Sequence, residues 1–273
     1  RSVALSSPEQ IPFGEKMIAE KIGAVGWMIF NKPERHNALS LDMWQAIPQI
    51  LDLFEEDPEI RVIVLKGAGE KAFISGADIS EFDKLRSSAE AVANYDHVSH
   101  EASLRLRHAR KPTIAMIRGY CIGGGLGVAL SCDMRIASDG SRFAIPAAKL
   151  GLGYRVSGLQ PLVALIGPAF AKEIIITARQ FDSAEALTMG LINRTVAPGD
   201  LDAYVAGYCK RIAQNAPLTM LAAKRVVDEI AKAPSGLDSA MCERLVEECF
   251  ASEDYVEGRR AFMEKRKPEF KGR

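Results

Sequence analysis

Two glycine-containing segments of this sequence have residue types that can bind a carbonyl oxygen through backbone N–H groups. The first is Gly123-Gly124-Gly125-Leu126-Gly127, between a predicted strand and a predicted helix. Consecutive glycines at a helix start cost backbone entropy, so they are expected where the backbone must approach a ligand. A helix N-terminus also offers unpaired N–H groups and a positive dipole end, which stabilise a developing oxyanion. The alternative is that the glycines only let the helix pack closely on a strand.

The second segment is Ser75-Gly76-Ala77-Asp78-Ile79. Alone, it is a common turn into a helix, in which Asp78 serves as the cap. Paired with the first segment it becomes more specific, because N–H donors from two turns can converge on one carbonyl oxygen. A nucleotide site is not favoured, since GxGxxG fails at Val128 and no GxxxxGK[ST] occurs.

The elements that would position these turns alternate between strands and helices up to about residue 196, which predicts the α/β class. Strands are expected over residues 20–31, 61–66, 112–117 and 134–138, with helices over 41–56 and 87–109. Past residue 196 the strand signals stop, and four amphipathic helices are expected over 199–214, 217–232, 236–251 and 253–265. We therefore predict an α/β core with the site over residues 1–200 and a helical oligomerisation region over residues 201–273.

Composition excludes several function classes. Lys+Arg and Asp+Glu both number 35, so the protein lacks a net field that would hold nucleic acid or an anionic membrane. No apolar run approaches the roughly 20 residues of a membrane helix. The five cysteines are scattered, which favours reduced thiols and a cytoplasmic location. Neither the cysteines nor the four histidines have the spacing of a metal site, so no metal is expected.

The two turns belong to a wider set of segments that resembles the crotonase (enoyl-CoA hydratase/isomerase) superfamily over nearly the whole chain. The matching segments are NKPERHNALS (31–40), KAFISGADISEF (71–82), KPTIAMIRGYCIGGGLGVALSCDMRIAS (111–138), LGLGY (150–154), FDSAEALTMGLINRTV (181–196) and EDYVEGRRAFMEKRKPEF (253–270). The resemblance implies a spiral of ββα units with a helical trimerisation region. It also implies a homotrimer or a dimer of trimers.

The resemblance further implies an acyl-CoA thioester as substrate, with no cofactor other than the coenzyme A of the substrate itself. The oxyanion-hole N–H groups fall on Ala77 and Gly124. The walls around the adenine and pantetheine of CoA fall on His36, Asn37, Ala38, Leu39, Ala77, Asp78 and Ile79. The basic C-terminal stretch, with Lys265, resembles the part that lies near the CoA phosphates in the assembled oligomer.

The chain departs from the family pattern at both catalytic glutamates of the hydratases. Those positions are Gly127 and Ala147 in this sequence. Adding water to an enoyl thioester needs one proton taken from water and one delivered to Cα, and each transfer assisted by a side chain contributes about 10²–10⁴-fold. Glycine and alanine can do neither, although an oxyanion hole can still stabilise an enolate that forms without a protein base.

Three functions remain open on these residues. The preferred one is a crotonase-type lyase that decarboxylates a malonyl- or methylmalonyl-type CoA. The Leu150–Tyr154 pattern and the C-terminal sequence resemble the methylmalonyl-CoA decarboxylase branch, which would make Tyr154 orient the substrate carboxylate. That branch has a histidine at Ala77 and a glutamate at Gly127. The second function is an enoyl-CoA hydratase or isomerase with another base, for which Glu81 and Asp83 are candidates, and the third is a non-catalytic acyl-CoA-binding protein.

Overall fold

The computed structural model describes residues 9–78, 80–81, 88–150, 152–232, 236 and 238–273. In this part of the chain the strands form a seven-stranded sheet in the order β1-β2-β3-β4-β6-β8-β11 and a four-stranded sheet in the order β10-β9-β7-β5. The strands are β1 (Glu9–Phe13), β2 (Met17–Ile22), β3 (Val25–Phe30), β4 (Val62–Gly67), β5 (Ala72–Ile74), β6 (Thr113–Ile117), β7 (Tyr120–Ile122), β8 (Met134–Ser138), β9 (Arg142–Ala144), β10 (Phe181–Asp182) and β11 (Arg194–Val196).

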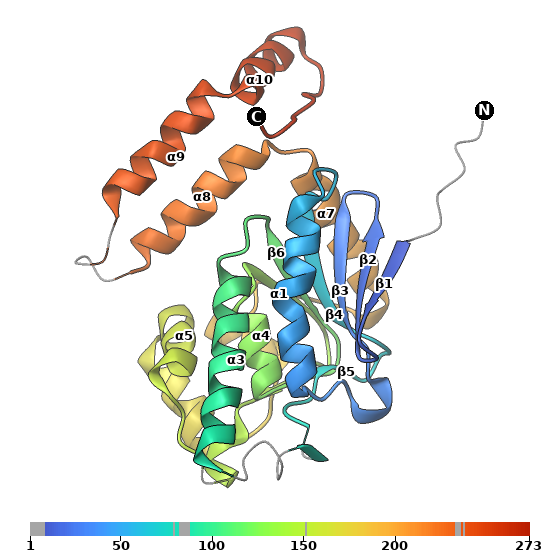
Figure 1. Cartoon of the computed structure of the whole chain (residues 1–273), viewed down its shortest axis with the longest axis vertical. Coiled ribbons are helices and arrows are strands. Elements are labelled where there is room, and N and C mark those ends of the chain that lie inside the picture. The colour runs from blue at the N-terminus through green and yellow to red at the C-terminus, as the bar shows by residue number, and fades with distance from the viewer. Residues whose placement is uncertain (1–8, 79, 82–87, 151, 233–235, 237) are drawn as a thin grey trace.

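The α-helices pack around these sheets, except for the last three, which extend away from them (Figure 1). They are α1 (Leu41–Glu56), α3 (Ala89–Arg107), α4 (Gly124–Leu130), α5 (Val156–Thr177), α6 (Ser183–Met189), α7 (Leu201–Ala213), α8 (Pro217–Ile230), α9 (Ser239–Ala251) and α10 (Glu253–Glu264). Short 3₁₀ helices η1 (Pro33–Arg35), η2 (Pro146–Leu150) and η3 (Pro198–Asp200) join some of these elements.

A ββα unit repeats along the middle of the chain. Strands β4, β6 and β8 run parallel in the large sheet, and the strands that follow them, β5, β7 and β9, run parallel in the small sheet. The helices after these pairs are α3, α4 and α5. Each unit thus adds one strand to each sheet and one helix, which confirms the predicted α/β spiral with helices at the C-terminus.

The predicted single strand over residues 20–31 is wrong. The segment contains the end of β2 and all of β3, which pair antiparallel from Met17↔Phe30 to Ile22↔Val25. Gly23, at φ 59°, makes the turn between them. The apolar pattern continues through the turn, so it does not reveal the reversal, which depends on a backbone conformation that glycine adopts easily.

The large sheet is buried on both faces, as the alternation of side chains along β4 shows. Ile63 and Leu65 pack into the main core with α1, whereas Val62 and Val64 pack against α7 on the opposite face. Successive strand residues point to opposite faces, so a run of apolar residues is expected in a strand covered on both sides. Helix α7 thus packs on the body of the protein, and the division at residue 200 stays a prediction.

Helices α8, α9 and α10 form an arm that extends from this body (Figure 1). The arm exposes large apolar side chains, including Ile230, Phe250 and Met263 at 69%, 61% and 81%. Its helices enclose a mainly apolar groove of about 1190 Å³. Exposed apolar area on this scale is unusual for an isolated protein surface and marks an interaction surface.

Helix α5 also carries exposed apolar side chains. By length and composition it could cross a membrane, which contradicts the expectation that no apolar run approaches that length. It is interrupted at Gly167, whose φ of 78° and ψ of 169° are not helical. The interruption by glycine and proline hides the length of the helix in the sequence.

Candidate active site

The two glycine-containing turns are neighbours in the structure. The glycine turn, residues 122–127, joins β7 to α4, and the alanine turn, residues 75–78, follows β5. A Cβ atom placed on Gly123 would lie 3.9 Å from Cα of Gly76. The two strands before the turns, β5 and β7, run side by side in the small sheet. Sheet pairing therefore places both turns at the same edge.

The hydrogen bonds between the alanine turn and Leu39 leave the N–H of Ala77 directed away from Leu39. Leu39 forms an isolated parallel bridge with Ala77. Its N–H donates to Gly76 O at 2.7 Å, and its carbonyl accepts from Asp78 N–H at 2.8 Å. Because the bridge uses the groups on either side of Ala77, the N–H of Ala77 takes no part in it.

The glycine turn supplies the second N–H group. Gly124 is the first residue of α4, so its N–H has no acceptor within the helix. Gly123 precedes it at φ 55° and ψ −118°, and its own N–H donates to Ala144 O at 2.8 Å. The adjacent turns thus each carry one amide that its own element leaves unused, at Ala77 and Gly124, and the role of these amides in binding an oxyanion stays a prediction.

Close packing explains another of the glycines. A Cβ atom on Gly125 would lie 2.4 Å from the carbonyl oxygen of Ile74 and 2.7 Å from its Cβ. Only glycine therefore lets α4 lie this close to β5. Both interpretations of the glycine run have structural support, because Gly125 serves helix–strand packing while Gly124 leaves an amide at the helix start.

Gly127 and Ala147, the positions at which the resemblance implies glutamates, differ in the space they offer. A Cβ atom on Gly127 would have no heavy atom within 4 Å, so the α4 surface there is open. Ala147, in η2, is 5% exposed and packs in the main core. The protein therefore has open space at Gly127 and a buried apolar side chain at Ala147.

Tyr154 lies at the edge of the main core, next to Tyr95 of α3. Burial, and then the nearby Tyr95, raise the pKa of Tyr154 above its usual value, so its phenol is neutral at pH 7. Tyr95 in turn accepts a hydrogen bond from Trp44 Nε1 at 3.0 Å. The Trp44 ring lies 3.4 Å from a Cβ atom placed on Gly124. Aromatic side chains thus connect Tyr154 with the glycine turn.

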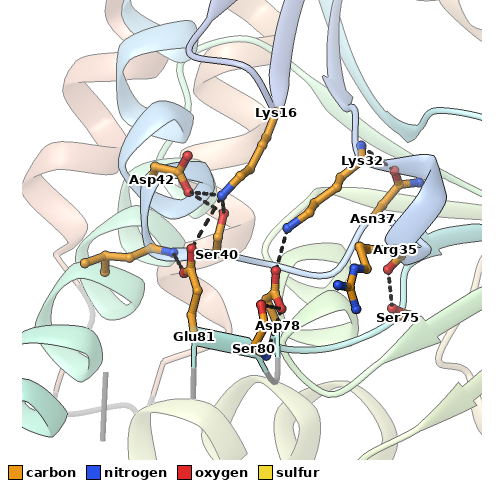
Figure 2. Close-up of polar contacts among 11 residues, drawn as sticks. Lys16, Lys32, Arg35, Asn37, Ser40, Asp42, Ser75, Asp78, Ser80 and Glu81 are labelled. Atoms are coloured by element: carbon orange, nitrogen blue, oxygen red, sulfur yellow. Dashed lines mark hydrogen bonds and ion pairs between the residues drawn. The ribbon is translucent and has the colours of Figure 1, made fainter. Parts of the chain in front are cut away.

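The candidate replacement base Glu81 is engaged in other contacts (Figure 2). Its carboxylate lies 3.5 Å from Lys16 Nζ and accepts the N–H of Leu41 at the start of α1, at 3.3 Å. An anion at a helix N-terminus is stabilised there and does not need to take up a proton. The other candidate, Asp83, lies outside the described residues, as does Ile79 of the predicted CoA wall.

The segment from His36 to Leu39 uses most of its polar groups within the protein. Asn37 is fully buried, and its side-chain amide donates to the carbonyl oxygens of Ala68 and Ala72 at 3.0 and 2.8 Å. Ala38 is half-buried and Leu39 is buried. His36 is exposed, and its ring centre lies 6.1 Å from that of Tyr120. His36 thus offers a side chain at the surface, while Asn37 holds the loop.

Asp78 and Lys265 occupy very different places. The Asp78 carboxylate is buried against Lys32 at 2.5 Å, a partner that the sequence analysis missed (Figure 2). Lys265 is exposed in a left-handed conformation directly after α10, a helix of the arm that Figure 1 shows well away from α4. Within one chain it does not join the two turns.

Among the described residues, no group of three His, Cys, Asp or Glu side chains could hold a metal ion. Arg155, another polar residue near Tyr154, forms an exposed ion pair with Asp96 at 2.8 Å. The chemistry of the candidate site thus centres on backbone amides and one neutral phenol.

A spiral α/β fold with two free amides at adjacent turns is suited to an enzyme that stabilises an oxyanion, and comparison with known proteins identifies the family. The model of the family "Enoyl-CoA hydratase/isomerase" matches residues 20–273, so the chain belongs to this enzyme family. A short-chain-enoyl-CoA hydratase of Clostridium acetobutylicum is 35% identical over 258 residues, covering 94% of this chain and 98% of that protein.

Further similar proteins agree with this assignment. A crotonyl-CoA hydratase of Syntrophomonas wolfei is 32% identical over 261 residues, which cover 94% of this chain and 98% of the relative. The crystal structure of an enoyl-CoA hydratase/carnithine racemase from Magnetospirillum magneticum is 36% identical and superposes with a TM-score of 0.90, covering 97% of each chain. The crotonase fold predicted from the sequence is thus confirmed.

Proposed function

We propose that this protein binds an acyl-CoA thioester and polarises its carbonyl between the N–H groups of Ala77 and Gly124. The observation that carries the proposal is the adjacency of the glycine and alanine turns, each with an amide not used by its own element. Two such donors stabilise negative charge that moves onto the thioester oxygen. Such charge arises as an enolate when water adds at Cβ of a 2-enoyl thioester or when carbon dioxide leaves Cα of a malonyl-type thioester, so the same two donors could serve several reactions.

Among these reactions, we propose hydration of a 2-enoyl-CoA as the first candidate. The names of the similar proteins support hydration and give no support to the decarboxylation preferred from the sequence. Without glutamates at Gly127 and Ala147, Tyr154 is our candidate for proton transfer. Water adds at Cβ as electrons pass to the thioester oxygen, the neutral phenol gives its proton to Cα of the resulting enolate, and the phenolate takes the surplus proton of the added water.

Decarboxylation of a malonyl-type CoA is the second candidate, because one observation favours it specifically. The walls at Gly127 and Ala147 carry no carboxylate that would repel a substrate carboxylate. Loss of carbon dioxide leaves its electron pair on Cα, and the oxyanion hole stabilises the enolate without a protein base. Tyr154 would then orient the departing carboxylate.

Product analysis distinguishes these candidates. The protein is incubated separately with crotonyl-CoA and methylmalonyl-CoA, and the products are identified by mass spectrometry. Hydration gives a product heavier by one water, and decarboxylation gives a product lighter by one carbon dioxide. Tyr154→Phe removes only the hydroxyl and should slow hydration by about 10²-fold, whereas a role in orientation alone predicts a smaller loss. An unchanged Tyr154→Phe rate would remove Tyr154 from the reaction.

We also propose that the protein assembles as a homotrimer or a dimer of trimers in the cytoplasm. The exposed apolar residues of the arm support assembly, since closed symmetry is the usual way to bury such a surface. The five cysteines are free thiols, which supports a reducing compartment. Light scattering at micromolar concentration tests the assembly, and a monomer mass would contradict it.

A further inference from the structure

A buried ion pair fixes the alanine turn to the large sheet, as Figure 2 shows. Lys32 Nζ lies 2.5 Å from one carboxylate oxygen of Asp78, and the two side chains are only 16% and 4% exposed. The other oxygen of Asp78 accepts hydrogen bonds from the N–H of Ser80 at 3.0 Å and from its hydroxyl at 2.6 Å. Both oxygens of Asp78 therefore have partners within the protein.

Lys32 belongs to a rigid part of the chain. It lies two residues after the end of β3, and its N–H donates to the side-chain oxygen of Asn37 at 2.9 Å. The buried Asn37 amide group in turn binds the carbonyl oxygens of Ala68 and Ala72, which flank the connection between β4 and β5. The ammonium group that meets Asp78 thus extends from a loop that is tied to three strands.

The place of Asp78 in the chain makes this anchor relevant to the oxyanion hole. Asp78 directly follows Ala77, and its N–H holds the bridge to Leu39 that directs the N–H of Ala77 away from it. A change in the conformation of Asp78 would therefore turn the amide that faces the substrate. Effective oxyanion stabilisation requires donors fixed in advance at hydrogen-bonding distance.

The charge of Asp78 also requires compensation. Burial raises the pKa of Asp78, but the hydrogen bonds from Lys32 and Ser80 outweigh it and hold the pKa at about 2. Asp78 is thus ionised at neutral pH, one residue from an amide that must stabilise an enolate oxygen. The carboxylate of Asp78 and an enolate oxygen bound at the N–H of Ala77 would repel each other strongly in a partly buried site. The ammonium group of Lys32 cancels this repulsion.

We propose that Lys32 is a positioning residue of the oxyanion hole, which acts through Asp78 by fixing the alanine turn and by neutralising the carboxylate next to Ala77. This inference rests on the proposed function, because it gives Lys32 a role in polarising the bound thioester. The Lys32–Asp78 ion pair, which lies outside the glycine-rich motifs, would thus contribute to polarising the thioester carbonyl.

A chromophoric thioester reports this step directly. In cinnamoyl-CoA the carbonyl is conjugated with an aromatic ring, so polarisation of the carbonyl moves its absorption to longer wavelength. Spectra and dissociation constants are measured for the unmodified protein, Lys32→Met, Asp78→Asn and Lys21→Met. Lys21 is a matched control, since it also extends from the large sheet and lies 2.7 Å from an aspartate, Asp57. Melting temperatures establish that each variant is folded.

Lys32→Met should retain binding within about threefold but lose more than half of the spectral shift, because it removes polarisation and leaves most of the binding contacts. Turnover of the true substrate should fall by about 10²-fold, comparable to the loss of one oxyanion donor. Asp78→Asn loosens the turn without leaving an unpaired anion, so its shift should lie between those of Lys32→Met and the unmodified protein. Lys21→Met should behave as the unmodified protein.

The order of the spectral shifts decides the inference. An unchanged shift in folded Lys32→Met would overturn it, and so would a larger loss in Asp78→Asn than in Lys32→Met. If Lys32→Met does not fold, Asp78→Asn decides, with a reduced shift supporting the inference and an unchanged shift overturning it. If the unmodified protein binds no acyl-CoA, both the proposed function and this inference fail. If the unmodified protein binds cinnamoyl-CoA and shifts its spectrum but Lys32→Met gives the same shift, only this inference fails.

Discussion

The glycine turn and the alanine turn each contribute one amide, yet they are held in place by different interactions. The glycine turn has no ionic contact and depends on backbone hydrogen bonds and on the close approach of Gly125 to Ile74. The alanine turn depends on the buried Lys32–Asp78 pair and on the contacts of Asp78 with Ser80. The same chemical task is thus supported by packing on one side and by charge on the other.

This difference predicts different sensitivities. A packed turn tolerates changes of pH and salt but not an added methyl group. A turn held by a buried ion pair tolerates moderate salt, because buried pairs are weakly screened, but it responds to protonation and to loss of one partner. Changes in packing and changes in charge should therefore affect the two turns to different degrees.

Gly125→Ala should have the largest effect. Its methyl group would lie 2.4 Å from Ile74 O, so α4 must move away from β5. We expect a loss of about 1–3 kcal/mol in unfolding free energy, as for other overpacked sites, and a large loss of activity because Gly124 moves with the helix. Gly127→Ala is the matched control, since nothing lies within 4 Å of its Cβ and alanine favours helix by about 1 kcal/mol. Equal melting temperatures for the two variants would contradict this account.

Restoring carboxylates should increase hydration. Gly127→Glu with Ala147→Glu should raise the rate of crotonyl-CoA hydration by on the order of 10²-fold, the lower end of the contribution of an acid–base group. The open space at Gly127 accepts a side chain, whereas the core around Ala147 must adjust, which limits the gain. Single variants should gain less, because both proton transfers involve the same water. An unmodified protein that already hydrates crotonyl-CoA at roughly 1–10³ per second would show that another base is present.

Acid should weaken the alanine turn before the glycine turn. The pKa of Asp78 is about 2 in the folded protein and lies below its ordinary value, so the pair contributes stability above about pH 4. That contribution decreases as the pH falls from about 4 to 2 and Asp78 is protonated. Unfolding free energies of the unmodified protein and of Asp78→Asn should therefore differ at pH 6 and converge toward pH 2. A difference that stays constant over this range would contradict the assigned charge.

The ion pairs of Lys16, which lie beyond the alanine turn, should matter least. Lys16 binds Asp42 and Glu81 at 3.2 and 3.5 Å, but its side chain is 23% exposed and those of its partners are 54% and 32% exposed. Exposed pairs contribute about 0–1 kcal/mol, so Lys16→Met should change the unfolding free energy by less than Asp78→Asn does. Urea unfolding of both variants tests this order, which fails if Lys16→Met is the more damaging change.

Much of the fold was predictable because periodic apolar patterns follow secondary structure. The α1 helix begins after Ser40 at the expected residue, and β4, β6 and β8 occupy the expected positions. The β2–β3 reversal at Gly23 was not predictable, since a turn inside a continuous apolar pattern depends on a single backbone angle. The length of α5 was hidden by its internal glycine and prolines for the same local reason.

The candidate site was predictable where function depends on the backbone. The glycine-rich turns indicate two places where free amides can occur, and the family resemblance assigns the N–H groups to Ala77 and Gly124, which stays a prediction. The sequence does not reveal that Lys32 meets Asp78, because the two residues are 46 positions apart and only the fold brings them together. A lysine shortly after a strand is usually a surface residue, so no local signal distinguishes this one. The burial of the Asn37 side chain was not predictable either, because its partners Ala68 and Ala72 are also distant in the sequence.

The most direct test of the account compares a thioester with an analogue that lacks only the carbonyl oxygen. Calorimetry measures the binding of butyryl-CoA and of the matching butyl thioether of CoA, which share every other contact. If the amides of Ala77 and Gly124 bind the carbonyl oxygen, the thioester should bind at least about tenfold more tightly, the effect of roughly 1.4 kcal/mol of hydrogen bonding. Equal affinities would show that the two turns do not hydrogen-bond the carbonyl oxygen, and would contradict the claim that Ala77 and Gly124 polarise a bound thioester.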